Sequence, residues 1–555
     1  MSDSVPEPVA QYTGINDSND LDLENGKNNS NEEGYNEDLA SDTNEKVSRR
    51  LSKRLTGVDD LHYDENDPIP PMGDNKEYPP MLPDVSAYSV GFDGPKDPLH
   101  PQNWSLSKKL IQCALIGINT FCVAFGSAIF AQAVLPLAEI YHVHYVVTTL
   151  SVTLYVLGFA TGPIIWAPLS ELYGRRPVLI LSSFTFCCFN FAVAVSDRLE
   201  SILICRFFAG CLGAAPLVVV PASFADMFGN ETRGTAIVIF AMAVFVGPLL
   251  APFIGGFIVA NHSLGWRWTE FLVGILSAAS FAFILVFESE THHPIILVYK
   301  AREIRRKTGN WGIHAPHDEF SLTIKEIAEN NLTRPLKMLF TEPILFFITL
   351  YNAFIYGMVY LFLSAYPIVF ADGYGMAPGV AELPYFGLVI GQFLGGAYCI
   401  FEERTYNRKM RESGGKVIPE NRLPPMLVGG IAFPIGLLWF CWTGNYHRTV
   451  HWIVPTVSGL FTGFGLISIF VPSLNYVIDT YLVLAASALA GNTFLRSIFG
   501  GVFPLFATFM FTKMGTNWAG LLLGLFSVLL ILCPLSFMKW GKQLRKKSKY
   551  AFDLA

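Results

Sequence analysis

Twelve long apolar segments constrain this chain of 555 residues more than any other feature of its sequence. A run of about 18 or more apolar residues is long enough to cross a bilayer as a helix. The segments lie at about 110–135, 146–168, 178–196, 201–224, 235–259, 268–288, 343–371, 379–401, 424–443, 452–474, 484–511 and 517–538. Only 15% of all residues are charged, against about a quarter in a soluble domain. We therefore predict an all-α membrane protein with 12 transmembrane helices.

A polar stretch from Ser289 to Glu342 divides these spans into two sets of six. Six spans, a long connection and six more spans form a two-fold repeat at the level of hydropathy. We expect two pseudo-symmetric six-helix bundles, at 101–290 and 343–540, joined by a central cytosolic loop at 291–342. A disordered acidic tail at 1–100 and a basic tail at 541–555 complete the predicted division.

The distribution of charge predicts how the chain is oriented. Residues 1–100 contain 22 Asp and Glu against 8 Lys and Arg, a composition too polar to bury a core. The predicted inner connections and the C-terminal tail carry 23 Lys and Arg, whereas the outer connections carry four. Because short cytosolic loops are rich in Lys and Arg, this asymmetry predicts that both termini are cytosolic.

Several other classes of function are disfavoured by the sequence. It contains no Walker-type Gly-x-x-x-x-Gly-Lys-Ser/Thr pattern, which disfavours ATP-driven transport. The adjacent pair His292-His293 lacks the spacing of a catalytic histidine box, which disfavours an enzyme. The nine cysteines lie in apolar stretches without metal-ligand spacing. We expect no enzymatic activity, no cofactor, no metal and no nucleic-acid partner.

The connection between the second and third spans reads Ala-Pro-Leu-Ser-Glu-Leu-Tyr-Gly-Arg-Arg-Pro. In it Gly174 provides the turn, Glu171 can cap or pair near a helix end, and Arg175 and Arg176 hold the turn on the cytosolic side. The stretch resembles the loop signature of the major facilitator superfamily, Gly-x-x-x-Asp-(Arg/Lys)-x-Gly-Arg-(Arg/Lys). It departs from that signature at the leading Gly, at the Asp, which is Glu171 here, and at the first base, which is Leu172. The alternative is a positively charged tight turn without a further role.

Arg206 stands inside the fourth span, in the pattern Arg-x-x-x-Gly-x-x-Gly-Ala-Ala. A guanidinium in an apolar helix costs at least ~2.5 kcal/mol unless it finds a partner or snorkels to the surface. The pattern is similar to the fourth-helix signature of drug/proton antiporters, in which the arginine is implicated in proton coupling. Snorkelling to the outer surface is the alternative.

The fifth span contains the run Gly-Pro-x-x-x-Pro-x-x-Gly-Gly, formed by Gly247, Pro248, Pro252, Gly255 and Gly256. Gly and Pro at this density bend a helix and leave a smooth groove against its neighbour. The run resembles the antiporter signature of the superfamily, which occurs in its exporters and not in its uniporters and symporters. A plain packing groove is the alternative.

Together these motifs resemble the twelve-span drug:H⁺ antiporters of fungi, in the branch of polyamine and multidrug exporters. The resemblance runs from about Asn103 to Lys549. It implies that Asp226, at the end of the fourth span, serves proton coupling together with Arg206. It also implies that this acid pairs with the loop arginine as an inner latch, for which a helix cap is the alternative.

Polar and aromatic side chains in the spans are candidates for a substrate cavity. Tyr351, Asn352, Tyr356 and Tyr360 follow helical spacing in the seventh span and would offer aromatic walls and hydroxyls to bulky or cationic ligands. Plain helix packing is the alternative reading of this stripe. The other candidates are Gln132, Tyr155, Gln392, Asn475, Asn492, Phe494 and Arg496.

The resemblance implies a proton-coupled antiporter that exports organic compounds across a fungal membrane. The proton gradient would be its driving force, and its partners would be a small organic substrate, protons and the bilayer. We expect a monomer in the plasma membrane, with the vacuolar membrane as the alternative. The sequence does not select among drugs, weak acids and polyamines. A transporter-like nutrient sensor, or an importer of a small organic solute, remains an alternative.

Overall fold

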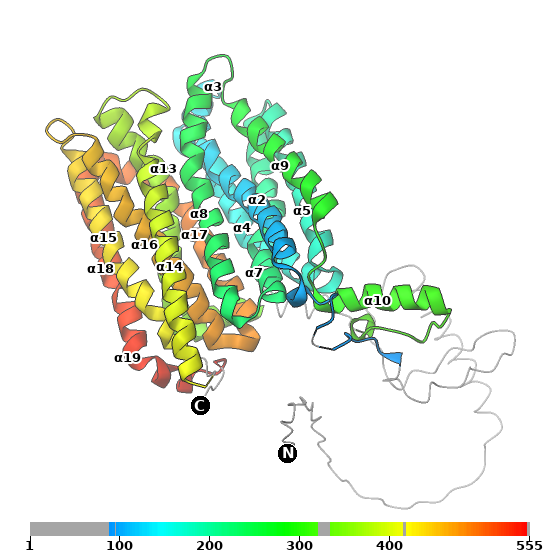
Figure 1. Cartoon of the computed structure of the whole chain (residues 1–555). Coiled ribbons are helices and arrows are strands. Elements are labelled where there is room, and N and C mark those ends of the chain that lie inside the picture. Colours follow the sequence, from blue (N-terminus) through cyan, green and yellow to red (C-terminus); the bar gives the residue numbers. More distant parts are fainter. Residues whose placement is uncertain (1–87, 95, 320–332, 415–417, 552–555) are drawn as a thin grey trace, which may run out of the picture. The chain divides into compact units, whose positions relative to one another are not determined.

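The computed structural model describes residues 88–551 apart from 95, 320–332 and 415–417. These residues lie in one unit, Leu82–Ala555, and Figure 1 shows them as a bundle of long helices. Twelve helical segments in them are long and apolar enough to cross a membrane. The prediction of an all-α chain with 12 transmembrane helices is confirmed. Most of the predicted acidic tail lies outside the described residues.

Each span corresponds to one helix or to a short series of helices. The first six are α2 with α3 (Leu106–Ile129, Val134–Ile140), α4 (Tyr145–Tyr173), α5 (Arg175–Val195), α6 with α7 (Leu199–Gly213, Ala215–Met227), α8 (Asn230–Ala260) and α9 (Arg267–Phe287). The second six are α13 (Pro343–Pro367), α14 (Tyr385–Glu412), α15 (Leu423–Asn445), α16 (Ile453–Tyr481), α17 (Ala485–Met514) and α18 with α19 (Thr516–Leu530, Leu532–Lys547). We use the name terminal face for the end of the bundle at which α2 begins and α19 ends.

Proline accounts for breaks within two spans. Pro216 occupies the first turn of α7, directly after the break from α6, and Pro534 lies in the first turn of α19 after the break from α18. Proline lacks the N–H that would continue the hydrogen-bond ladder, but it fits the first turn, where that donor is free. These prolines therefore fit the start of a new helix within one span.

The helix contacts repeat between the two halves of the chain. In the first half α2 packs on α8, α4 on α6, and α5 on α9; in the second, α13 packs on α17, α14 on α16, and α15 on α18. The contacts between the halves repeat as well, because α4 packs on α17 and α8 packs on α14. Each of these contacts has a counterpart six spans away, which is the two-fold pseudo-symmetry expected from hydropathy.

Two glycines let α4 and α6 approach each other closely. A Cβ on Gly158 would collide with backbone atoms of Cys211, and a Cβ on Gly210 would collide with the Tyr155 carbonyl. Small residues permit such backbone contact between membrane helices, where packing replaces the hydrophobic effect as the driving force. The glycines of the fourth-span pattern therefore place α6 against α4, and with it Arg206.

We expect Gly210→Ala to lower the thermal midpoint of the detergent-solubilised protein, because overpacking a tight contact costs about 1–3 kcal/mol. Gly117→Ala is the matched control, since nothing lies within 4 Å of a Cβ on that α2 residue. Fluorescence-detected size-exclusion after heating measures both variants. Equal midpoints for Gly210→Ala and the wild type would contradict this packing.

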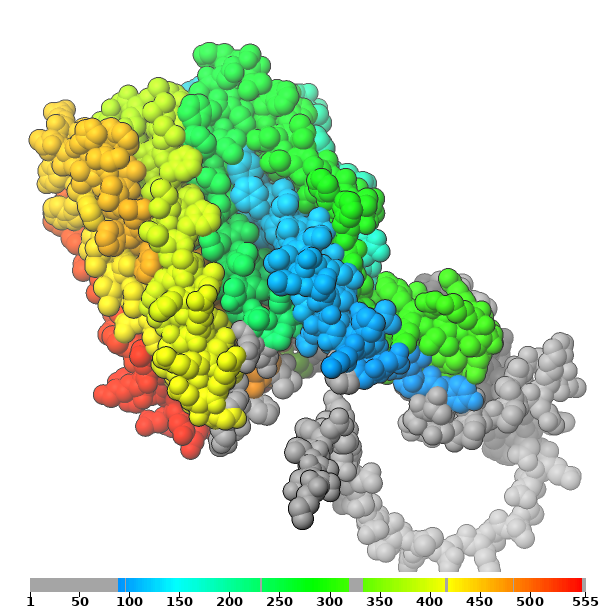
Figure 2. All heavy atoms as spheres, in the orientation of Figure 1, coloured from blue at the N-terminus to red at the C-terminus, as the bar shows by residue number. Residues whose placement is uncertain are grey.

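The central connection is not simply an irregular loop. It contains α10 (His293–Thr308) and the short helix α12 (Arg334–Thr341). In Figure 2 the last part of the tail (blue) lies beside α10 (green), and Val90 N donates at 2.9 Å to the carbonyl of His314, which follows α10. Asp97 is buried and accepts hydrogen bonds from two backbone N–H groups. This last part of the tail thus differs from the predicted disorder, because it has backbone partners in the central connection.

Candidate functional site

Two opposite charges meet in the interior of the first half. The guanidinium of Arg206 on α6 and the carboxylate of Glu270 on α9 form an ion pair of 2.9 Å, and both side chains are 0% exposed. Arg206 also donates to the carbonyls of Gly126 at 2.9 Å, Ser151 at 3.3 Å and Ser127 at 3.4 Å. A buried ion pair is stable only when further hydrogen bonds satisfy the remaining donors, and Arg206 has such partners on α2 and α4.

Aromatic rings enclose the same guanidinium. The Arg206 Cζ lies 4.2 Å from the ring centre of Tyr155 and 4.7 Å from that of Phe130. The Tyr155 hydroxyl donates to the Val123 carbonyl at 2.8 Å, which fixes the ring. Arg206 therefore does not snorkel to the surface. Tyr155, predicted to line the substrate cavity, is a wall of this charge site.

Glu270 was missed in the sequence. It lies at the start of the sixth span, beside the charged and aromatic run Trp266-Arg267-Trp268, so it resembled a residue of the connection. The available signal was an acid inside the first turn of an apolar helix, in the same half as an arginine that needs a partner.

A chain of hydroxyls links the charge site to the second half. Ser127, whose carbonyl binds Arg206, also joins its hydroxyl to the Tyr360 hydroxyl on α13 at 2.8 Å. Tyr360 in turn contacts the Tyr356 hydroxyl at 3.2 Å. The Tyr356 ring lies 4.7 Å from the guanidinium of Arg496 on α17, so the chain ends at a second buried cation. We call this series, from Glu270 to Arg496, the central network.

Arg496 differs from Arg206 in having no counter-charge. Among the described residues it forms no ion pair, and its buried Nε has no hydrogen-bond partner. The rings of Tyr356 and Phe470 are its neighbours, the latter with its centre 5.2 Å away. A buried cation held by aromatic faces is able to accept an anionic group, or to repel a cationic one.

Three further cavity candidates are buried on α13 and α17 but lie against groups outside the central network. The side-chain Oδ1 of Asn352 accepts from the Ser473 hydroxyl at 2.7 Å, and the Asn492 side-chain amide donates to the Thr349 hydroxyl at 3.4 Å. The Tyr351 hydroxyl faces α15, because a Cβ on Gly430 would lie 3.0 Å from it. Tyr351 therefore points away from the central network, within the second half.

The remaining candidates are spread over the bundle. Gln392 on α14 donates to the Met242 carbonyl on α8 at 2.9 Å and so bridges the halves. Asn475 lies toward the terminal face, beside a cavity of about 50 Å³. Phe494 is half-buried on α17, and Gln132 follows α2, next to Gly255. The structure brings Tyr155, Tyr356, Tyr360 and Arg496 together with Arg206, and places the others elsewhere.

The Gly-Pro run of the fifth span lies between two neighbours. A Cβ on Gly247 or on Gly255 would meet the backbone of α2 at 2.8 and 3.0 Å. A Cβ on Gly256 would meet Gly379 of the second half at 3.1 Å, while Pro248 and Pro252 lie inside α8. The run thus packs α8 against the helix that carries Ser127.

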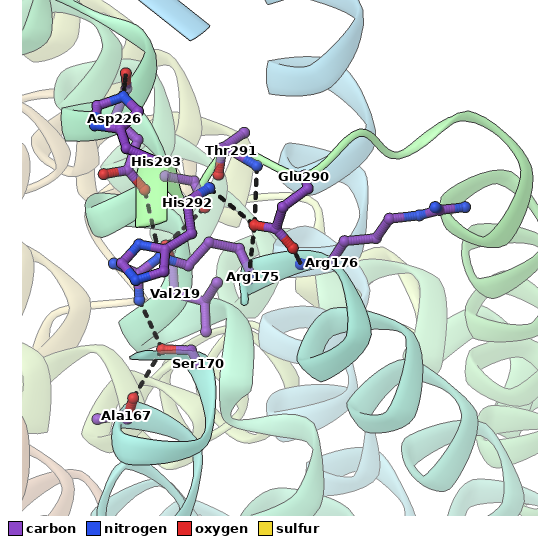
Figure 3. A network of polar contacts seen from close by, with 11 residues as sticks. Ala167, Ser170, Arg175, Arg176, Val219, Asp226, Glu290, Thr291, His292 and His293 are labelled. Carbon is purple, nitrogen blue, oxygen red and sulfur yellow. Dashed lines mark hydrogen bonds and ion pairs between the residues drawn. The ribbon is translucent and has the colours of Figure 1, made fainter. Parts of the chain in front are cut away.

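At the terminal face the loop between α4 and α5 forms the predicted pair (Figure 3). Arg175 Nε lies 3.4 Å from Asp226 Oδ2 on α7, and its Nη1 donates to the Ser170 hydroxyl at 2.7 Å. Gly174 has φ +97°, a left-handed conformation that L side chains rarely adopt. A Cβ there would also collide with the carboxylate of Glu290. The turn thus requires glycine for two reasons.

Glu290 holds the start of α5. Its carboxylate accepts from the backbone N–H groups of Arg175 at 2.9 Å, Arg176 at 3.1 Å and His292 at 2.8 Å, where a negative charge also suits the helix dipole. Burial and the positive Arg175 lower the pKa of His292 to about 3, so this ring stays neutral. The structure differs here from the prediction for Glu171. That residue is exposed, and among the described residues it forms no ion pair.

The second half has a buried charge cluster of its own at the terminal face. Arg422, at the start of α15, lies 2.9 Å from Asp479 Oδ2 on α16 and 2.6 Å from Glu403 Oε1 on α14. The Tyr406 hydroxyl donates to Asp479 at 3.0 Å, and its ring centre lies 3.5 Å from the Arg422 Cζ. Glu403 also touches Gly234 of α8, so this cluster lies against the first half.

We call the Arg175–Asp226 pair the first latch and the Arg422–Asp479 cluster the second latch. The two latches occupy equivalent positions in the repeat. Each joins an arginine at the start of the third helix of its half to an aspartate near the end of the fourth. The sequence separations are similar, 51 residues for Arg175 and Asp226 and 57 for Arg422 and Asp479. Sequence reasoning missed the second latch, although this recurrence between the halves could have revealed it.

Known proteins resemble this chain in sequence and in fold. Residues 116–504 match the Major Facilitator Superfamily. The chain is 56% identical over 511 residues to the Multidrug transporter TPO1_2 of Candida glabrata, covering 92% of this chain and 88% of that protein. It is 52% identical over 516 residues to the Major facilitator superfamily multidrug transporter FLU1 of Candida albicans, covering 92% and 85%.

Solved structures share the fold. The proton:xylose symporter XylE bound to 6-bromo-6-deoxy-D-glucose has a TM-score of 0.56 at 15% identity, covering 79% of this chain and 96% of that chain. The human organic anion transporter MFSD10 has a TM-score of 0.53 at 15% identity, covering 78% and 100%. Fold and sequence together define a membrane transporter built from two six-helix halves. The chain belongs to the major facilitator superfamily.

Proposed function

We propose that this protein exports organic compounds, drugs foremost, in exchange for protons. The names of relatives at 52–56% identity support the class of substrate. The observation that carries the coupling to protons is the fully buried pair of Arg206 and Glu270. A carboxylate in this position is the group in the central network that can take up and release a proton while the arginine stays charged.

The central network suggests how such a proton would act. Protonation of Glu270 removes the counter-charge of Arg206, and an unpaired buried cation is unstable. Arg206 holds the carbonyl of Ser127, whose hydroxyl contacts Tyr360 of the other half. A change at Arg206 therefore reaches the contact between the halves. Contacts made in one state and broken in another are the usual basis of alternating access.

The two latches at the terminal face fit the same proposal. Each is a charge cluster that is largely removed from solvent, and Glu403 of the second cluster touches the first half at Gly234. Formed in one state, they would hold the terminal face closed. Broken in the other state, they would let it open. We propose that this face is cytosolic, that the protein is a monomer, and that it resides in the plasma membrane of a fungal cell.

The experiment is uptake into inside-out membrane vesicles with an acidic interior, tested with spermidine, an azole and cycloheximide. Export against protons predicts accumulation of at least one compound, lost when an ionophore collapses the pH gradient. Vesicles without the protein are the control. Equilibration that ignores the pH gradient would indicate a facilitator instead.

A second prediction concerns orientation. Asn331 and Asn230 belong to sequons on connections proposed to be cytosolic, so neither should carry a glycan. Asn331 lies outside the described residues, while Asn261 belongs to a sequon on the opposite face, where it follows α8. Endoglycosidase treatment with Asn→Gln variants at each site measures this. A mobility shift that Asn331→Gln removes would reverse the orientation.

A further inference from the structure

An open groove of about 370 Å³ lies on the outside of the first half, toward the terminal face. Its walls are apolar side chains of α5 and α9, among them Leu181, Phe184 and Phe281, and its remaining edge is formed by Arg176 and by Tyr299 of α10. The rings of Phe184 and Phe281 are 5.5 Å apart. The groove thus has one apolar side and one polar end.

The apolar side faces the hydrocarbon of the bilayer. Leu181 is 51% and Phe184 49% exposed, and α9 beside them exposes further large apolar residues toward its end, Phe283, Leu285, Val286 and Phe287. Exposed apolar surface of this extent on a spanning helix is covered by acyl chains.

The polar end carries positively charged side chains. The Arg176 side chain points away from the latch (Figure 3), its Nη2 donates to the Leu285 carbonyl at 3.2 Å, and its buried Nε has no partner among the described residues. Arg302 of α10 is exposed, and its Cζ lies 6.0 Å from the Tyr299 ring centre. Within the described residues neither arginine forms an ion pair. Arg176 and Tyr299 therefore form the polar end of the groove, and Arg302 lies beside Tyr299.

Two acids, Glu288 and Glu290, lie near Arg176. The carboxylate of Glu290 is occupied by backbone N–H groups at the start of α5. Glu288 is buried, and burial together with the negative Glu290 raises its pKa to about 8, so it is mostly protonated at neutral pH. The Arg176 side chain extends away from Glu290 (Figure 3), so its guanidinium is left to a ligand of the groove.

We propose that this groove binds one anionic phospholipid, with an acyl chain between α5 and α9 and the headgroup phosphate on Arg176, Arg302 and Tyr299. Guanidinium groups bind phosphate oxygens through paired, charge-assisted hydrogen bonds. Figure 1 shows α10 lying across the direction of the spanning helices, as an interfacial helix does. Anionic lipids are enriched in the cytosolic leaflet, which is the leaflet of the terminal face if the proposed orientation holds.

The test is native mass spectrometry of the detergent-purified chain titrated with dioleoyl phosphatidylserine or dioleoyl phosphatidylcholine. We expect one phosphatidylserine to bind about tenfold more tightly than phosphatidylcholine. Arg176→Gln combined with Arg302→Gln should abolish this preference. Lys546→Gln combined with Lys547→Gln, which removes two exposed charges of α19 on the same face, should retain it.

Two further measurements cover a double variant that does not fold and binding through the headgroup alone. If the double variant does not fold, Arg302→Gln and Tyr299→Phe alone should each weaken binding severalfold. Glycerophosphoserine, which has the headgroup but no chains, should not displace the lipid. Equal binding of both lipids, an unchanged double variant, or displacement by glycerophosphoserine or inorganic phosphate would overturn the proposal. This readout does not depend on transport, so it fails or succeeds independently of the proposed export.

Discussion

Arg206→Ala is expected to abolish proton-driven transport by the protein. Breaking a buried ion pair costs about 3–5 kcal/mol, because the remaining charge is left without compensation. At about 1.4 kcal/mol per factor of ten, this corresponds to a loss of at least roughly 100-fold in a coupling equilibrium that depends on the pair. Arg206→Lys should retain part of the activity, since an ammonium can still pair with Glu270 but cannot reach all three carbonyls that the guanidinium binds.

A double variant separates coupling from folding. Arg206→Met with Glu270→Gln removes both charges and leaves residues of similar size, which is often neutral for stability. We expect it to reach the membrane in normal amounts and yet to accumulate no substrate in response to a pH gradient. Wild-type efflux by well-expressed Arg206→Ala or by this double variant would contradict a coupling role for the pair.

The second large effect is expected at the first latch. Asp226→Asn and Arg175→Ala should each impair transport strongly, because each leaves a partly buried charge without its partner. The exchanged pair, Asp226→Arg with Arg175→Asp, should recover part of the activity. Recovery should be incomplete, since the exchange loses the hydrogen bond from Arg175 to Ser170.

Glu171→Gln is the matched control for the latch. Glu171 lies in the same loop but is exposed, and among the described residues it forms no ion pair, so its substitution should change transport little. Transport and surface expression are measured side by side for all variants. Full activity of Asp226→Asn at normal surface expression would mean that this acid only caps a helix end.

The spans and their two-fold repeat could be predicted because the bilayer imposes them on the sequence. Length and hydropathy alone identify a membrane helix, and the long polar connection divides the twelve. The helical content of that connection was less evident. Its helix α10 has positively charged residues at its end and only a short apolar face, a pattern that also occurs in unstructured polar segments.

Partners between distant helices could not be read from the sequence. Glu270 is 64 residues from Arg206, and nothing in either segment indicates which way each helix is rotated. The unknown rotation of the helix also explains why Tyr351 was grouped with Tyr356 and Tyr360. It shares their helical spacing but faces α15. Helix α13 is buried nearly all round, so no difference between polar and apolar faces marks the side toward the central network.

Protons are proposed to act on the transporter through Glu270. The test uses purified protein in liposomes that contain a pH-sensitive dye, with proton movement recorded when a transported compound is added. Glu270→Gln keeps the shape of the side chain but cannot lose a proton. We expect this variant still to exchange labelled for unlabelled substrate, while its substrate-driven proton movement disappears. Proton movement at the wild-type level in Glu270→Gln would contradict this role of Glu270.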